Sequence, residues 1–175
     1  MSSWFASIVG SAPAPKWVAV LDTSVLVPAA NASRDDTVNV KVVRAAVSGL
    51  FECVLSAYIQ EEVREVLQRP EFGYTIQEIE AKFAPLWSTA RFLEPVPYDD
   101  PQLLKVVHGD SDDLPVLATG LATKTDELLG PLPTKFIVSN NTTDFTPGQK
   151  PFGLHFVTAV MFWHHLQRGA KARLP

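Results

Sequence analysis

The chain has a single cysteine, Cys53, among its 175 residues. One cysteine excludes a disulfide within the chain and is typical of a reducing compartment. No apolar run is long enough to cross a bilayer, and residues 1–16 lack the basic start and the sustained apolar stretch of a secretory signal. From these absences we expect a soluble cytoplasmic protein that does not associate with membranes.

The chain also lacks an excess of positive charge, because its formal net charge is −4. This argues against binding to nucleic acid through one broad basic face, but it leaves open a local contact with a phosphodiester through metal ions. Neither a P-loop nor a glycine-rich dinucleotide turn occurs. The hydrophobic share of 46% and the charged share of 19% describe an ordinary globular protein, long enough to bury a full core.

Apolar strands alternate with amphipathic helices along the chain. We expect strands at about 17–21, 51–56, 135–139 and 154–157. We expect helices at about 37–49, 56–69, 75–92, 112–124 and 158–168. This alternation predicts a three-layer α/β/α sandwich around a mainly parallel sheet. We expect one domain over residues 17–168, preceded by a loose leader (1–16) and followed by a tail (169–175).

The first candidate for a functional residue is Asp22, which ends the apolar run from Val18 to Leu21. Such a run predicts a strand that is buried on both faces of a parallel sheet. A negative charge at the end of that strand is costly unless something pairs with it. The alternative is that Asp22 only caps the helix after it, since Asp is a preferred helix cap.

Three further acids follow the predicted strands. Glu62 lies near the start of the helix after the second strand, Asp113 opens the helix at 112–124, and Asp144 follows the strand at 135–139. Ligands of open parallel sheets bind beyond the carboxyl ends of the strands. All four acids could therefore reach one edge of the sheet.

Each of these acids also has an ordinary structural explanation. Glutamates on helices are usually solvated, but Glu62 borders the apolar stripe of its helix, whereas Glu61 points nearly opposite. Capping alone accounts for one aspartate at the start of helix 112–124. Of the three there we rank Asp113 first, Asp112 second and Asp110 third. Turn loops favour aspartate, and this accounts for Asp144 taken alone.

Four inward acids at one edge would repel one another unless a divalent cation neutralised them. A set of oxygen ligands without a cluster of cysteine or histidine favours Mg²⁺ or Mn²⁺ over zinc. Such an ion can activate a water for in-line attack on a phosphodiester. We interpret His155, His164 and His165 as structural or surface residues.

In four stretches that contain these acids, the chain resembles the PIN-domain nucleases, in particular the VapC-like toxins of type II toxin–antitoxin pairs. These stretches carry the resemblance, in this order along the chain: VLDTSVLV, SAYIQEEVREVLQRPEF, DSDDLPVLATGLA and VSNNTTDF. The whole match runs from about Trp17 to Trp163. The resemblance implies a metal-dependent endoribonuclease that cleaves RNA. It also implies a cognate antitoxin and a homodimer.

Carried over by position, the resemblance assigns the metal site to Asp22, Glu62, Asp113 and Asp144. Thr23 or Ser24 would support the first aspartate, and Asn141 would order the fourth motif. Asp112 remains the alternative to Asp113. One branch of these toxins shares the letters RPEF that end the second stretch. That branch usually has an aspartate where this chain has Asn141.

Three other classes of protein share part of this sequence pattern. Phosphatases with an aspartyl nucleophile need a second aspartate where this chain has Ser24. Phosphate-receiver domains need a lysine after a late strand, whereas Lys135 precedes its strand. A PIN-fold binding or scaffold module without catalytic activity is the alternative to a nuclease, but all four expected acids are present.

Overall fold

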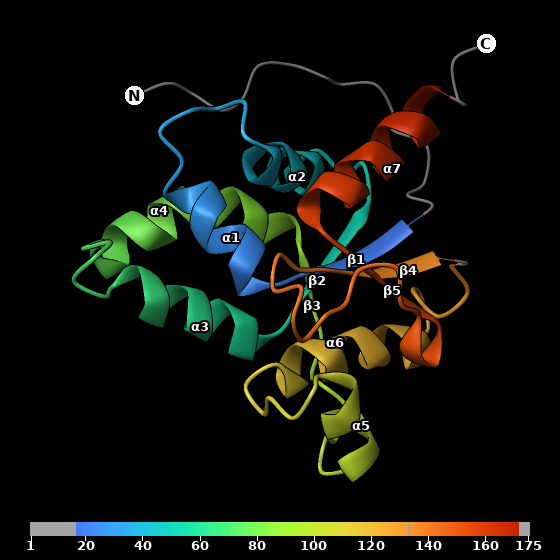
Figure 1. Cartoon of the computed structure of the whole chain (residues 1–175). Helices are drawn as coiled ribbons and strands as arrows, with labels where there is room; N and C mark the ends of the chain where they lie inside the picture. The colour runs from blue at the N-terminus through green and yellow to red at the C-terminus, as the bar shows by residue number, and fades with distance from the viewer. Residues whose placement is uncertain (1–16, 133, 172–175) are drawn as a thin grey trace.

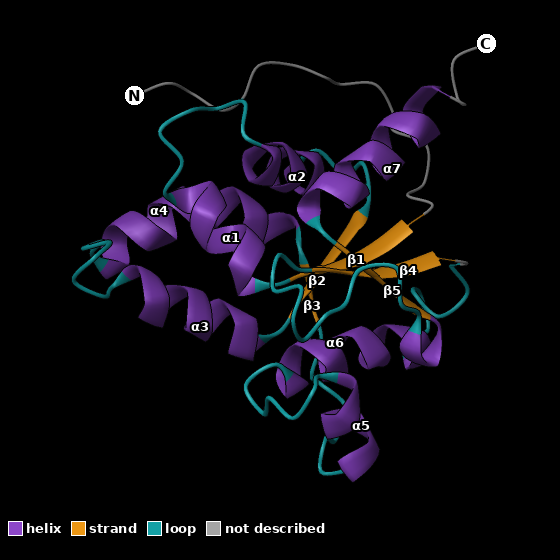
Figure 2. Cartoon of the chain, in the orientation of Figure 1, coloured by secondary structure: helices purple, strands orange, loops and turns teal. Residues whose placement is uncertain are grey.

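The computed structural model describes residues 17–132 and 134–171 of the chain. Its centre is a five-stranded sheet in the order β3-β2-β1-β4-β5, in which all neighbouring strands are parallel. Helices cover both faces of the sheet (Figure 2). The predicted α/β/α sandwich with a parallel sheet is therefore confirmed. The strands are β1 (Trp17–Leu21), β2 (Glu52–Leu55), β3 (Arg91–Phe92), β4 (Thr134–Val138) and β5 (Leu154–Val157).

The register of the central strands brings their carboxyl ends together. Strand β1 pairs with β4 from Trp17 opposite Thr134 to Leu21 opposite Val138. Both strands are buried over most of their length, as their apolar composition requires. The residues that follow them, Asp22 and Ser139, consequently start from adjacent positions at one edge of the sheet.

Two layers of helices enclose this sheet. Figure 1 shows α2 (Val38–Val47) and α7 (Ala159–Lys171) on one side, and α6 (Leu114–Thr125) with α5 (Pro101–Val106) on the other. The remaining elements are α1 (Thr23–Ala30), α3 (Ala57–Leu67), α4 (Ile76–Thr89) and the 3₁₀ turn Pro151–Gly153. No described helix is both long enough and apolar enough to span a membrane.

Side-chain caps explain where several helices begin. The hydroxyl of Ser56 accepts the N–H of Ile59 and starts α3 directly after β2. Thr75 and Glu78 form a reciprocal capping box at the start of α4. These local signals fix the direction in which each helix leaves the strand or loop before it.

The histidines near the carboxyl terminus have structural surroundings. The rings of His155 and His165 each lie 5.4 Å from the ring of Phe136, which also packs against Phe162. His164 is exposed on α7. The interpretation of these histidines as structural or surface residues agrees with this placement.

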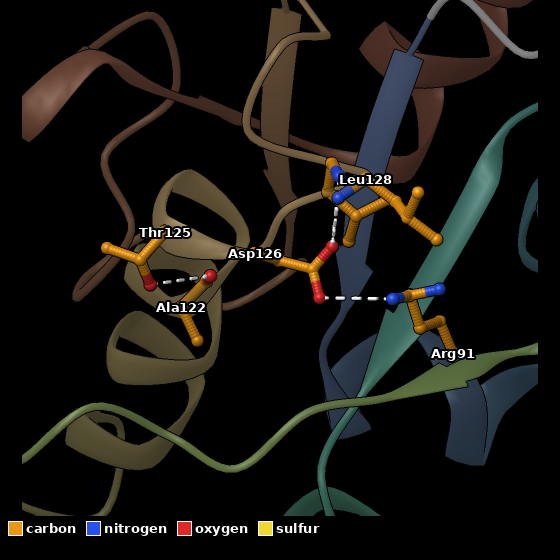
Figure 3. A network of polar contacts seen from close by, with 6 residues as sticks. Arg91, Ala122, Thr125, Asp126 and Leu128 are labelled. Carbon is orange, nitrogen blue, oxygen red and sulfur yellow. Dashed lines mark hydrogen bonds and ion pairs between the residues drawn. The ribbon is translucent and has the colours of Figure 1, made fainter.

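A polar junction ties the end of α6 to the sheet (Figure 3). The carboxylate of Asp126 accepts the N–H groups of Leu128 and Leu129, at 3.0 and 2.9 Å, and lies 3.1 Å from the Arg91 guanidinium on β3. Together with the Arg91 guanidinium, these two bonds lower the pKa of Asp126. The junction fixes the turn that leads into β4.

Some elements differ from the sequence-based predictions. The helix expected at 75–92 ends at Thr89, and residues 91–92 form β3 at the edge of the sheet instead. Helix α5 begins at Pro101, and α1 comes directly after Asp22; the sequence pattern predicts neither helix. Helix α7 continues three residues past Arg168, to Lys171. The expected leader (1–16) and residues 172–175 of the expected tail lie outside the described residues.

Candidate metal centre

Asp22 is held by hydroxyl groups rather than by a helix. It occupies the position before α1, but its carboxylate accepts no N–H from that helix. Instead its Oδ2 accepts hydrogen bonds from Ser24 Oγ at 2.5 Å and from Ser139 Oγ at 2.7 Å. The residue is only 4% exposed. The helix-cap alternative is therefore wrong for the Asp22 side chain.

Ser24 is in turn fixed by Asn140, the residue after Ser139. The backbone N–H of Asn140 donates to Ser24 Oγ at 2.8 Å, and its side-chain Nδ2 donates to the Ser24 carbonyl at 3.1 Å. That carbonyl needs an outside donor, because the residue four positions on is Pro28, which has no N–H. Asn140 thus replaces the helix hydrogen bond that Pro28 removes.

Glu62 lies on the inner side of α3, as the spacing predicts. Its Oε2 accepts a hydrogen bond from Thr23 Oγ1 at 2.5 Å, which joins α3 to the first turn of α1. Burial, followed by the charges of Asp22 and Asp112, raises the pKa of Glu62, while the Thr23 bond opposes this shift. Glu61 points outward and pairs with Arg64 at 3.1 Å.

Three further acids form a group beside Asp22 and Glu62. Asp110, Asp113 and Asp144 each place a carboxylate oxygen within 4.8 Å of the other two. Asn141 lies between two of these acids, because its Nδ2 donates to Asp113 at 2.9 Å and to Asp144 at 2.8 Å. Burial first, and then the charges of Asp22, Asp144 and Asp110, raise the pKa of Asp113 to about 8. Asp113 is thus electrostatically coupled to Asp22 as well as to its own group.

The aspartates before α6 have different surroundings. Asp113 lies at the position before the helix without capping it, so the capping explanation does not apply to its side chain. Asp112 is exposed and outside the group of three; its N–H donates to Asp110 Oδ1 and its carbonyl accepts from Tyr58. Asp110, which the sequence ranks third, lies with Asp113 and Asp144.

Sequence reasoning missed Ser139 and Asn140 as site residues. A signal for them exists, since both directly follow the buried strand β4, which pairs with β1 up to the residue before Asp22. Side chains that follow two paired parallel strands meet at the same edge. Applied to hydroxyl and amide residues as well as to acids, this rule would have found both.

Within the described part of the chain, no salt bridge reaches Asp22, Glu62, Asp110, Asp113 or Asp144. The groups that contact them are neutral hydroxyls and amides. A set of carboxylates with oxygen atoms only, and with no cation to balance them, suits a hard divalent ion such as Mg²⁺ or Mn²⁺. The donor set therefore fits a metal of this kind.

Lys135 lies away from this edge of the sheet. It pairs in register with Val18, near the amino ends of the strands, and its ammonium group donates to the carbonyls of Gly130 and Leu132. A phosphate-receiver domain requires a lysine beside its acids. The position of Lys135 does not meet that requirement.

The fold and the site together define the class of the protein. It is an α/β protein with an acidic cluster at the carboxyl edge of a parallel sheet, and this cluster is compatible with metal binding. The family model described as PIN domain matches residues 18–142. The chain belongs to the PIN domain family, whose members are generally metal-dependent nucleases. The match includes Asp22, Glu62 and Asp113 and ends two residues before Asp144. No curated protein matches the sequence.

Proposed function

We propose that this protein is a Mg²⁺- or Mn²⁺-dependent endoribonuclease that hydrolyses RNA phosphodiester bonds. The observation that carries the proposal is the convergence of Asp113, Asp144 and Asp110 within 4.8 Å of one another, electrostatically coupled to Asp22. Membership of the PIN domain family supports the nuclease class. The free energy cost of this convergence is offset when a divalent cation is held there.

In this proposal Asp22, Asp113 and Asp144 hold the ion. Asp110 is a further ligand at the rim, an addition that comes from its place in the group of three. Ser24 and Ser139 orient Asp22, and Asn141 orients Asp113 and Asp144. These neutral donors fix the carboxylates without neutralising them, which preserves their charge for a cation.

When bound, a divalent ion supplies Lewis-acid polarisation of the phosphodiester and lowers the pKa of a coordinated water. The chain contributes the orientation of that water. The Thr23 hydroxyl donates to Glu62 Oε2, so the Glu62 carboxylate is held in one orientation. The raised pKa of Glu62 suits a group that takes up a proton during the reaction. The other two roles open to Glu62 are to orient the water and to serve as a metal ligand.

We further propose that the protein is the toxin of a toxin–antitoxin pair. The support is the resemblance of four stretches of its sequence to the VapC-like group, in order along the chain. On this proposal a cognate antitoxin binds the protein, the protein forms a homodimer, and both act in the cytoplasm. Size-exclusion chromatography with light scattering tests the dimer, because a mass of one chain would contradict it.

The test compares RNA cleavage by the wild type and by Asp22→Asn in Mn²⁺, with EDTA as the metal-free control. Loss of a residue that only orients a metal ligand commonly costs about 10–100-fold in activity. We therefore expect Asp22→Asn to lose more than about 100-fold. Asp35→Asn is the matched control, because Asp35 is exposed and forms its ion pair with Arg44 on α2. Equal rates for Asp22→Asn and the wild type would contradict the proposal.

The alternative, a PIN-fold binding module without activity, predicts a different pair of results. Such a module would show neither cleavage nor a change of melting temperature when Mn²⁺ is added. The proposed nuclease should show both cleavage and a rise of melting temperature. A rise in melting temperature without cleavage of any RNA would support the metal site and contradict the ribonuclease activity.

A further inference from the structure

Tyr58 joins the two segments that carry the acids. It lies in the first turn of α3, four residues before Glu62 and therefore on the same face of the helix. Its hydroxyl donates to the backbone carbonyl of Asp112 at 3.3 Å, next to Asp113. Helices α3 and α6, which carry or follow these residues, also contact each other (Figure 1). The ring of Tyr58 thus lies at the rim of the candidate metal centre.

The ring has one anchored end and a solvent-exposed surface. Tyr58 is 38% exposed although its hydroxyl is hydrogen-bonded. Burial, then the carboxylates of Glu62 and Asp112, raise the pKa of Tyr58 to about 12, so the phenol is neutral at physiological pH. An aromatic side chain held at its polar end loses little conformational freedom when a ligand packs on the ring.

A second exposed aromatic residue, Tyr98, lies near enough to contribute to the raised pKa of Tyr58. It is 40% exposed and precedes α5. Among the described residues, about two fifths of each of these two tyrosines is left exposed to solvent. Exposed aromatic rings beside a phosphodiester-cleaving site are surfaces on which nucleobases stack.

The charge of the protein favours a contact with RNA that does not depend on positive side chains. Its formal net charge is −4, and the rim around Tyr58 carries Glu62, Asp110 and Asp112. Electrostatic attraction to the RNA backbone is therefore weak except through the metal. Stacking on an aromatic ring provides affinity without positive charge, and it requires a base that is not already stacked inside a duplex.

We propose that Tyr58 is a substrate-positioning residue, on whose ring an unpaired nucleobase of the RNA stacks. The proposal rests on the proposed ribonuclease function and adds a residue that binds the substrate. An unpaired base next to the scissile phosphodiester stacks on the Tyr58 ring. A duplex keeps its bases inside the helix and gains nothing from this contact.

Two substitutions separate stacking from the structural link to Asp112. Tyr58→Phe keeps the ring and removes the hydroxyl that donates to the Asp112 carbonyl. Tyr58→Leu removes the ring as well. We expect Tyr58→Phe to retain the wild-type KM for a single-stranded RNA within about 2-fold. We expect Tyr58→Leu to raise KM by about 10-fold with kcat nearly unchanged, because stacking binds ground state and transition state alike.

Phe152→Leu is the matched control, since Phe152 is also exposed (42%) but lies beside Lys124, toward the end of α6 remote from the acids. It should leave KM unchanged. Equal losses of kcat in Tyr58→Phe and Tyr58→Leu would show that only the link to Asp112 matters and would overturn the proposal. Equal KM values for the wild type and Tyr58→Leu would overturn it as well.

A second measurement works without metal or cleavage. Single-stranded RNA that carries 5-iodouridine is irradiated with the wild-type protein in EDTA, and the crosslinked residue is located by mass spectrometry. We expect crosslinks at Tyr58 and none from a duplex of the same sequence. Crosslinking at Tyr58 without any Mn²⁺-dependent cleavage would contradict the proposed nuclease alone. Cleavage without crosslinking at Tyr58 would contradict stacking alone.

Discussion

Asp113 shows at the scale of one residue what the site costs the protein. Its carboxyl group has a pKa of about 8 in the folded chain, whereas the ordinary value is 3.8. Burial, followed by the charges of Asp22 and Asp144, causes this rise. Between these two pH values the folded chain keeps a proton that the unfolded chain has lost. The free energy of unfolding of the metal-free protein therefore falls as pH rises from about 4 to about 8.

The first prediction follows from this sign. In EDTA, the melting temperature of the wild type should fall as the pH is raised from 5 to 8, and Glu62 contributes in the same direction because its pKa is also raised. Asp113→Asn cannot ionise, so its melting temperature should fall less and exceed that of the wild type at pH 8. Differential scanning calorimetry at four pH values measures both. Parallel curves for the two proteins would refute the electrostatic account of Asp113.

The second prediction concerns Asn140 and Pro28. Asn140→Ala removes the side-chain donor to the Ser24 carbonyl, so Ser24 should hold Asp22 less firmly. We expect the affinity for Mn²⁺ to fall by about 10-fold, as for other residues that orient metal ligands. Asn31→Ala, at the exposed end of α1, is the matched control and should have no effect. Isothermal titration calorimetry with Mn²⁺ gives both affinities.

Pro28→Ala provides an internal check on this pair. Alanine at position 28 has the N–H that proline lacks, so it supplies the helix donor for the Ser24 carbonyl. In the double variant Asn140→Ala, Pro28→Ala, part of the lost Mn²⁺ affinity should return. Two independent, additive losses would show that the residues do not act on one carbonyl.

At the scale of elements, α6 packs closely against the sheet through Gly120. A Cβ atom at this position would lie 2.9 Å from Ile137 Cδ1 and 3.1 Å from Leu154 Cδ1. Both neighbours are fully buried, on β4 and β5. The close approach contributes to positioning the start of α6, and with it Asp113, against the carboxyl edge of the sheet.

Gly120→Ala should therefore destabilise the protein. Inserting a methyl group into a packed core costs about 1–3 kcal/mol, which outweighs the gain of about 0.5–1 kcal/mol from replacing glycine inside a helix. Urea unfolding followed by circular dichroism measures the difference. Combining Gly120→Ala with Ile137→Val removes the closest atom and should lessen the loss. A more stable Gly120→Ala protein would contradict this account of α6 packing.

The elements that could be predicted from sequence are those with a strong local pattern. Strands β1 and β4 are continuous apolar runs, and α3 has both a cap at Ser56 and an amphipathic stripe. Helix α1 escapes prediction because it is short, contains Pro28 and is buried on nearly all sides, so no stripe appears. Strand β3 has two residues and gains its place only by pairing with β2.

The candidate site shows the same division. Asp22, Glu62, Asp113 and Asp144 could be proposed from sequence, because each follows a predicted strand or opens a predicted helix. Ser139 could have been proposed in the same way, since it directly follows β4. The place of Asp110 depends on how two loops approach each other, through contacts such as Asn141 with Asp113. Such contacts join residues 28 positions apart and leave no local pattern.

At the scale of the whole molecule, repulsion among the acids should lower the free energy of unfolding of the metal-free protein. A bound metal ion should raise it again. Mn²⁺ at about 100 times its dissociation constant stabilises the folded state by about 2.7 kcal/mol. For a chain of this size that corresponds to a rise of roughly 5–10 °C in melting temperature. Thermal unfolding with and without Mn²⁺ measures the rise, and Asp113→Asn should show a smaller one. Equal rises in both proteins would place the ion elsewhere.

The most direct test of the central claim is a crystal structure of the wild-type protein with Mn²⁺, using anomalous scattering to locate the ion. We predict an anomalous peak at the carboxyl edge of the sheet, with oxygen atoms of Asp22, Asp113 and Asp144 about 2.0–2.3 Å away. An edge without a peak at saturating Mn²⁺, with Asp113 and Asp144 still bonded only to Asn141, would contradict the assignment of a metal centre.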